Sequence, residues 1–134
     1  MNFMKAYKRL DRLCKEHLNY KKGISTYIFE MTKIKYGQDK VITWKEDYKR
    51  LKRYRYIRNK IAHDELAEEA DLCTSKDVAW LNEFYKRILN KEDSLTCYYN
   101  KRNKSILRLI LKFILKILLF IIILIILVGI YHLI

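Results

Sequence analysis

Residues Tyr54–His63 have the sequence YRYIRNKIAH, in which an arginine and a histidine are separated by four residues. The segment ends a helix predicted from Thr43 to His63, because apolar residues recur through it at helical spacing. Thr43 and Glu46 fit a capping box at the start of this helix. Arg58 falls inside the apolar arc, where a guanidinium is costly unless it is paired or lines a cleft or a subunit interface. The arc consists of Trp44, Tyr48, Leu51, Tyr54, Ile57 and Ile61.

Three further helices are predicted around this one, each from a single apolar stripe. They run from about Phe3 to Tyr20, from about Ser25 to Lys33 and from about Ser75 to Asn90. The first is expected to stop at Lys21-Lys22-Gly23, with cations in its last turn and glycine in the left-handed conformation. The last begins after a second capping box, Thr74-Ser75-Lys76-Asp77.

The segments between these helices are predicted to be irregular. Ile34–Ile42 contains Gly37 and is expected to be a loop. Asp64–Asp71 is an acidic patch that is expected to neutralise the preceding basic helix locally, and it has no recognisable metal-ligand pattern. Absence of proline and the presence of only three glycines favour helix throughout, so the predicted fold class is all-α.

The bulk composition indicates a polyanionic partner. The formal net charge is +13, which suits RNA, DNA or an anionic membrane surface, or reflects the cytoplasmic side of a membrane protein. Cys14, Cys73 and Cys97 show no disulfide or zinc spacing, so they are expected to be reduced thiols packed as small apolar groups. No metal and no cofactor is expected.

The C-terminal segment is predicted to cross a membrane once. Ile117–Ile134 is 18 residues long and carries no Asp, Glu, Lys or Arg, which is close to the roughly 20 residues that a membrane helix needs. Cations precede it directly, so the positive-inside rule places the N-terminal domain in the cytoplasm, with the anchor in the cell membrane. The predicted parts are a helical domain at 1–93, a basic linker or helix extension at 94–104 and the anchor at 105–134.

Four of the cations before the span recur every four residues and form one slowly drifting stripe. These candidate membrane-interface residues are Lys104, Arg108, Lys112 and Lys116. The favoured interpretation is contact with anionic lipid headgroups. The alternative is that the stripe lines the mouth of a symmetric oligomer.

The segment Arg58-Asn59-Lys60-Ile61-Ala62-His63 resembles the R-x4-6-H motif of HEPN domains, which are small all-α domains of many prokaryotic RNases and defence proteins. A polar residue follows the arginine, as HEPN motifs prefer, and the motif lies on the third predicted helix. Arg12 and His17 have the same spacing, but a leucine follows that arginine and we interpret this copy as chance. The resemblance covers about residues 3–93 and implies a small HEPN-like helical bundle.

This resemblance implies a metal-independent endoribonuclease in a stress or antiphage response. His63 would transfer protons while the RNA 2′-OH attacks the adjacent phosphate, because histidine titrates near neutral pH. Arg58 would bind the scissile phosphate and stabilise its developing charge. Asn59 would orient either residue.

The spacing also constrains the assembly. Residues five apart on an ideal helix point about 140° apart, so Arg58 and His63 do not converge on a regular helix. Either the helix is distorted near Lys60–His63, or two copies share a site across a twofold axis, as HEPN domains typically do. We therefore expect a homodimer or a higher even-numbered homo-oligomer. In the non-catalytic alternative, Arg58 pairs with Glu30, and His63 stabilises the helix end.

The exposed face of the same helix interleaves cations and rings, which is typical of RNA-binding surfaces and also of solvated helix faces. The candidate RNA-binding residues are Lys49, Lys52, Arg53, Tyr56 and Lys60. Two other functions remain open at this point: an oligomeric membrane pore or effector, and a membrane adaptor that recruits a partner nuclease. In both, the HEPN-like domain would serve assembly or RNA sensing without catalysis.

Overall fold

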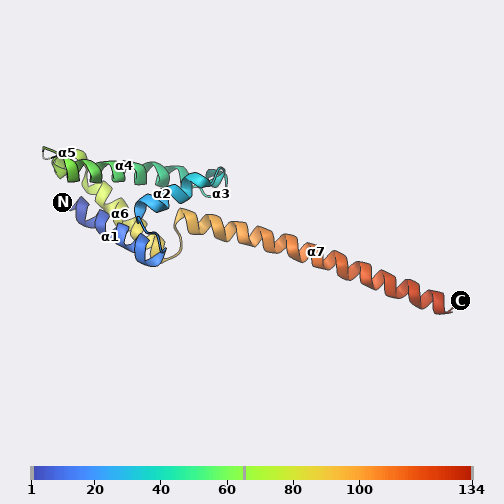
Figure 1. Ribbon diagram of the computed structural model, residues 1–134. Coiled ribbons are helices and arrows are strands. Elements are labelled where there is room, and N and C mark those ends of the chain that lie inside the picture. Colours follow the sequence, from blue (N-terminus) through green and yellow to red (C-terminus); the bar gives the residue numbers. More distant parts are fainter. Residues whose placement is uncertain (1, 65, 134) are drawn as a thin grey trace. The chain divides into compact units, whose positions relative to one another are not determined.

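The computed structural model describes residues 2–64 and 66–133, in which helices are joined by short turns and loops and no strand occurs. The predicted all-α fold is therefore confirmed, and a long apolar helix lies at the C-terminal end (Figure 1). The chain forms two units, Met1–Tyr98 and Tyr99–Ile134. The helices are α1 (Phe3–His17), α2 (Ile24–Lys33), α3 (Gly37–Lys40), α4 (Trp44–His63), α5 (Glu69–Leu72), α6 (Ser75–Leu89) and α7 (Ser94–Leu133).

The core of the first unit lies between the apolar faces of four helices. α1 packs chiefly against α6, and α2 packs chiefly against α4. The stripe predicted for α2 is buried, and so is that of α1 from Phe3 to Cys14, whereas Leu18 at its end is half-buried and the side chain of His17 lies outside the described part. Tyr48 and Ile61 of the predicted α4 arc are also only half-buried. The buried stripe residues of α1 and α2 are Phe3, Tyr7, Leu10, Cys14, Ile24, Tyr27, Ile28 and Met31.

Aromatic rings join these helices in the centre of the unit. Trp80 stacks on Phe84 with ring centroids 4.9 Å apart, and Tyr54 lies 5.4 Å from Trp80. The Tyr27 and Phe3 rings extend this cluster from α2 and α1. Offset-stacked and edge-to-face ring pairs of this kind add specificity to apolar burial.

The predicted end of α1 was wrong by about three residues. The helix ends at His17, and Asn19 rather than Gly23 takes the first positive φ, at 53°. Gly23 also has φ 53°, but it immediately precedes α2. A Cβ atom at Gly23 would lie 2.1 Å from Asp11 Oδ1, so this close approach requires glycine.

One predicted capping box is confirmed and the other is wrong. Asp77 Oδ2 accepts hydrogen bonds from the Thr74 N–H at 2.8 Å and the Thr74 hydroxyl at 2.9 Å, at the start of α6. Thr43 makes no such bond at α4, because its hydroxyl contacts Ser94 Oγ at 3.1 Å and Glu46 pairs with Arg50. The predicted loop Ile34–Ile42 was also wrong in part, since it contains α3.

The acidic segment has a structural role that differs from local neutralisation of α4. The N–H groups of Phe3 and Met4 donate to the Glu69 carboxylate, at 2.6 and 3.2 Å. Glu69 therefore satisfies unpaired amides at the start of α1, where the helix dipole also favours a negative charge. Cys73, directly after α5, is buried as expected for a small apolar group.

Buried polar contacts hold the first turn of α7 within the first unit. The Ser94 hydroxyl donates to Asp47 Oδ2 at 2.5 Å, and Asp47 also forms a two-pronged ion pair with Arg87 at 2.6 and 3.0 Å. The Tyr27 hydroxyl donates to Asp93 Oδ1 at 2.6 Å, directly before α7. The side chains of this turn therefore belong to the core rather than to a linker.

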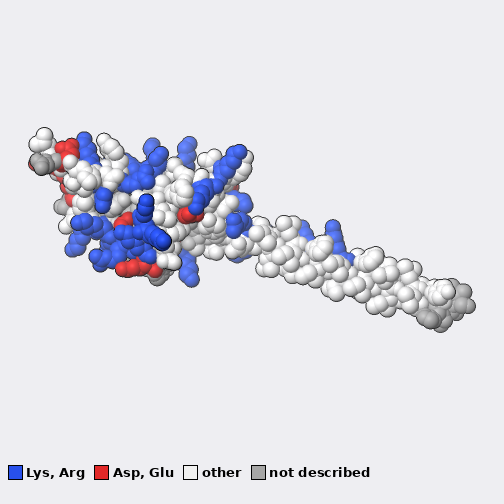
Figure 2. All heavy atoms as spheres, viewed as in Figure 1, with Lys and Arg blue, Asp and Glu red and all other residues white. Residues whose placement is uncertain are grey.

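Beyond this turn, α7 is long enough and apolar enough to cross a membrane. Its side chains from Asn100 to Tyr131 are all exposed, so no protein surface covers their apolar groups. In Figure 2, blue side chains occur on the first part of this helix and are absent farther along it. This distribution matches the charge-free run after Lys116.

Candidate functional site

Arg58 lies on the wall of a cavity of about 190 Å³ between α1, α2 and α4. It is half-buried, and its Nη1 atom donates to Asn59 Oδ1 at 2.9 Å. Asn59 therefore contacts the arginine side chain directly, and its role in catalysis stays a prediction. The alternative pairing of Arg58 with Glu30 was wrong, because Glu30 pairs with Lys33 at 2.6 Å. The cavity is lined by Tyr7, Lys8, Asp11, Lys15, Lys22, Ser25, Arg55, Arg58 and Asn59.

Cations dominate this cavity, which we call the basic cavity. Five of its nine residues are lysine or arginine, and Asp11 is its one acidic residue. Asp11 is already engaged: it pairs with Lys15 at 2.7 Å and accepts the Ile24 N–H at 3.0 Å. Among the described residues, the other four cations of the cavity form no ion pair, and such unbalanced positive charge attracts anions.

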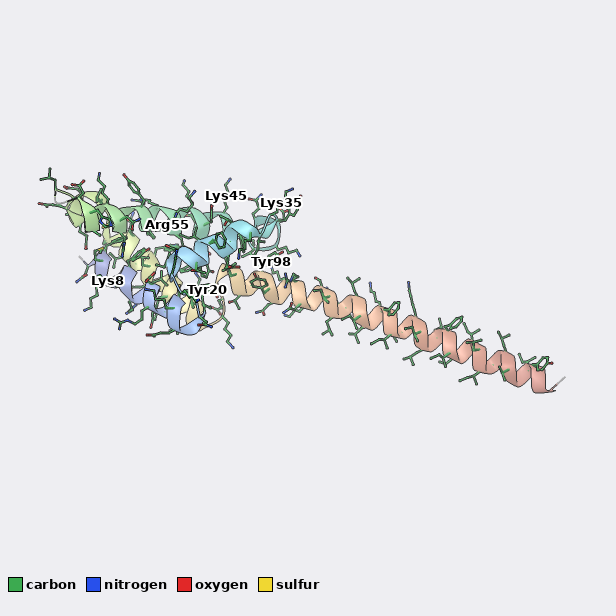
Figure 3. The ribbon with its side chains drawn as sticks, in the orientation of Figure 1. Lys8, Tyr20, Lys35, Lys45, Arg55 and Tyr98 are labelled. Atoms are coloured by element: carbon green, nitrogen blue, oxygen red, sulfur yellow. The ribbon has the colours of Figure 1, made fainter. Side chains whose placement is uncertain are left out.

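Sequence reasoning missed most of the basic cavity, because it took its catalytic and RNA-binding candidates from α4 alone. Lys8 and Lys15 occupy positions seven apart on α1, which places them on one face of that helix. Arg55 lies three residues before Arg58 on α4 and shares a face with it. The cationic spacing on α1 could have been noticed, but the approach of α1 to α4 could not. Figure 3 labels Lys8 on α1 and Arg55 on α4.

His63 does not join Arg58 within one chain. It is exposed and is the last residue of α4, which continues as a regular α-helix through Lys60–His63. The helix distortion that could have brought the two side chains together is therefore absent from this segment. On a regular helix the two residues point about 140° apart, so a site that uses both needs a second copy of the chain.

The candidate RNA-binding residues lie mostly on the exposed side of α4. Lys49, Lys52, Arg53 and Tyr56 are exposed, and Lys60 is half-buried. Arg53 is tied to Asp77 at 3.2 Å, so its charge is partly neutralised. In Figure 2, basic side chains are spread over the first unit on the face in view.

The candidate membrane-interface residues are exposed along α7: Lys104, Arg108, Lys112 and Lys116. Their spacing of four residues persists because the helix is unbroken between Ser94 and Leu133. Among residues 2–64 and 66–133, no group of three or more His, Cys, Asp or Glu side chains is arranged to hold a metal ion.

These features define an all-helical domain with a basic cavity, followed by a helix able to cross a membrane. The chain belongs to a family of unknown function, DUF6548, whose model matches residues 1–112. The match covers the whole helical domain and the first part of α7. Comparison with curated proteins and with solved structures finds no match in either.

Proposed function

We propose that this chain is a membrane-anchored HEPN-like protein that binds RNA and cleaves it without a metal ion when two copies assemble. The observation that carries the proposal is the Arg58–Asn59 pair on the wall of the basic cavity. A guanidinium that is held by a neighbouring amide and surrounded by cations is suited to a phosphate.

A second copy of the chain supplies the proton-transfer residue in this proposal. His63 is exposed at the end of α4, where a partner's phosphate-binding residues can reach it. Histidine can then accept or donate the proton of the 2′-OH reaction at neutral pH. In this proposal the span anchors the enzyme in the cell membrane, and the cations that precede the span support a cytoplasmic position for the basic domain.

The direct test is RNA cleavage by the full chain in lipid nanodiscs with EDTA present. Arg58→Ala and His63→Ala should each lower the rate at least about 100-fold, since each removes a group that acts in the transition state. The products should carry 2′,3′-cyclic phosphate ends. The second R-x4-H copy provides matched controls, because Arg12→Ala and His17→Ala should leave the rate within about twofold of the unaltered chain. Equal effects of the two pairs would refute the assignment.

The alternative membrane function is favoured by a different observation. The exposed cations Arg108, Lys112 and Lys116 lie on an apolar helix, where they could contact anionic headgroups or line an oligomeric opening. A pore or effector should release ions from liposomes without cleaving RNA, and Lys112→Ala with Lys116→Ala should change this leakage. An adaptor should show neither activity alone and should require its partner nuclease.

A further inference from the structure

The basic cavity is lined by one tyrosine hydroxyl in addition to its cations. Tyr7 lines the cavity and is only 4% exposed, yet its hydroxyl forms no hydrogen bond with the described parts of the chain. Burial raises the pKa of Tyr7, and the charge of Asp11 adds to this effect, while Arg58 and Arg55 oppose it. The hydroxyl therefore keeps its proton. The Tyr7 hydroxyl can therefore donate a hydrogen bond to an acceptor in the cavity.

Most of the cations beside Tyr7 have no acidic partner, and Arg58 donates only to the amide oxygen of Asn59. Within residues 2–64 and 66–133, no ion pair involves Lys8, Lys22, Arg55 or Arg58. The side chains around the cavity are thus mainly hydrogen-bond donors, with Asp11 already occupied by Lys15. A phosphate dianion supplies several acceptor atoms and two charges, which matches this set better than a carboxylate does.

A second hollow of about 600 Å³ continues from the basic cavity. The two share Lys22, Ser25 and Arg55, so they form one groove along α2 and α4. The second hollow adds Phe29, which is 58% exposed. Lys33 Nζ lies 4.4 Å from the centroid of its ring. An exposed ring beside a phosphate-sized cationic cavity offers a stacking surface for a base. Figure 3 labels Arg55 and Tyr20, which border this hollow.

We propose that this groove binds a nucleotide, with the phosphate against Tyr7, Arg55 and Arg58 and the base against Phe29. The site lies on a different side of α4 from the predicted RNA-binding face, and it requires neither His63 nor cleavage. It therefore goes beyond the proposed nuclease. The same chemistry is available from a free mononucleotide or from the phosphorylated end of an RNA strand.

The test is calorimetric titration of the full chain in nanodiscs of uncharged phosphatidylcholine. The probes are inorganic phosphate, adenosine, adenosine monophosphate, and short RNA with either a 5′-phosphate or a 5′-hydroxyl end. The monophosphate should bind at least about tenfold more tightly than adenosine or phosphate alone, because it fills both parts of the groove. A preference for 5′-phosphorylated RNA over the monophosphate identifies the strand end as the ligand, and the reverse identifies the free nucleotide.

Two variants separate the two parts of the groove. Arg55→Gln should weaken binding of the monophosphate at least about tenfold, as expected for a lost charge-assisted bond. Phe29→Ala should weaken it about fivefold or more through lost stacking while leaving inorganic phosphate unaffected. Lys45→Gln and Tyr36→Ala remove a cation and a ring that lie outside the groove, and they should leave every affinity unchanged.

The outcomes also separate this inference from the nuclease. Equal binding of the monophosphate and adenosine, or equal effects of Arg55→Gln and Lys45→Gln, would overturn the nucleotide site. His63→Ala should abolish cleavage and preserve nucleotide binding. If the chain binds the nucleotide but cleaves no RNA, the proposed nuclease is wrong and the nucleotide groove stands. If it cleaves RNA but binds no nucleotide, the groove is wrong and the nuclease stands.

Discussion

At the scale of single residues, Asp47 is the buried carboxylate on which the largest stability effect is expected. Its side chain is 2% exposed and receives two hydrogen bonds from Arg87, whose side chain is 16% exposed. Asp47→Ala leaves that guanidinium buried without its partner, which should lower the free energy of unfolding by about 3–5 kcal/mol. The measurement is urea unfolding of the full chain in detergent, followed by the fluorescence of Trp44 and Trp80 in the first unit.

The neighbouring Glu46 provides the matched control for this prediction. It pairs with Arg50 on the exposed side of α4, where solvent screens the attraction. Glu46→Ala should therefore leave the free energy of unfolding close to that of the unaltered chain. Similar losses for the two variants would show that the Asp47–Arg87 pair is not specially stabilising.

At the scale of elements, Asp77 couples the start of α6 to α4. Burial acts to raise the pKa of Asp77, but hydrogen bonds from Thr74 and Tyr54 and the charge of Arg53 hold it below its ordinary value. Ionised Asp77 therefore stabilises the fold above its unfolded pKa, and this contribution is lost as the pH falls through the folded pKa. Asp77→Asn should cost about 1–2 kcal/mol near pH 7, as for a lost helix cap.

The loss of unfolding free energy caused by Asp77→Asn should become smaller as the pH falls. Urea unfolding should be measured across the acidic range. The difference in unfolding free energy between Asp77→Asn and the unaltered chain should disappear below about pH 4, where unfolded aspartate becomes protonated. Asp39→Asn, at an exposed aspartate of α3, should produce no such gap. A gap that stays constant with pH would mean that the charge of Asp77 does not contribute.

The membrane-crossing role of α7 can be tested at the centre of its charge-free run. Leu124→Lys places a cation there, which should cost about 2.5–3.5 kcal/mol on insertion. The variant should be released from membranes by alkaline carbonate, whereas the unaltered chain should stay in the pellet. Leu115→Lys, beside Lys116, is the control and should remain in the pellet because its long side chain reaches the interface. Retention of Leu124→Lys would argue against a spanning helix.

Helical periodicity predicted the all-α fold and the buried faces of α1 and α2, because one apolar stripe per helix is a local property. The Thr74–Asp77 box was predictable for the same reason, since both partners lie within one turn. The Thr43 box failed because Ser94, 51 positions away, occupies the hydroxyl. The bonds from the start of α1 to Glu69, and the position of Lys8 in the same cavity as Arg58, likewise depend on tertiary packing. Sequence spacing predicted Arg58 as a site residue but not the cavity around it.

At the scale of the whole molecule, the proposed nuclease predicts complementation between inactive chains. If Arg58 of one copy acts with His63 of another, mixing Arg58→Ala and His63→Ala chains should rebuild one intact site in each mixed dimer. Random pairing in equal amounts should restore about a quarter of the original cleavage rate, because half the dimers are mixed and each has one of two sites. The measurement is cleavage after the two chains are co-reconstituted in nanodiscs.

Each inactive chain reconstituted alone is the control for this experiment. A doubly substituted chain, mixed with either of them, should restore nothing. Absence of recovery in the mixed sample, with dimers demonstrated by cross-linking, would mean that both residues act within one copy or that neither is catalytic.

The buried first turn of α7 has a mechanical consequence. The Ser94–Asp47 and Tyr27–Asp93 bonds join this turn to α4 and α2 inside the core. A force that drags on the C-terminal helix is therefore transmitted directly to the interior of the basic domain, with no slack segment to absorb it. The first bonds to carry that load are Ser94–Asp47 and Tyr27–Asp93, and Asp47 passes it on to Arg87 of α6.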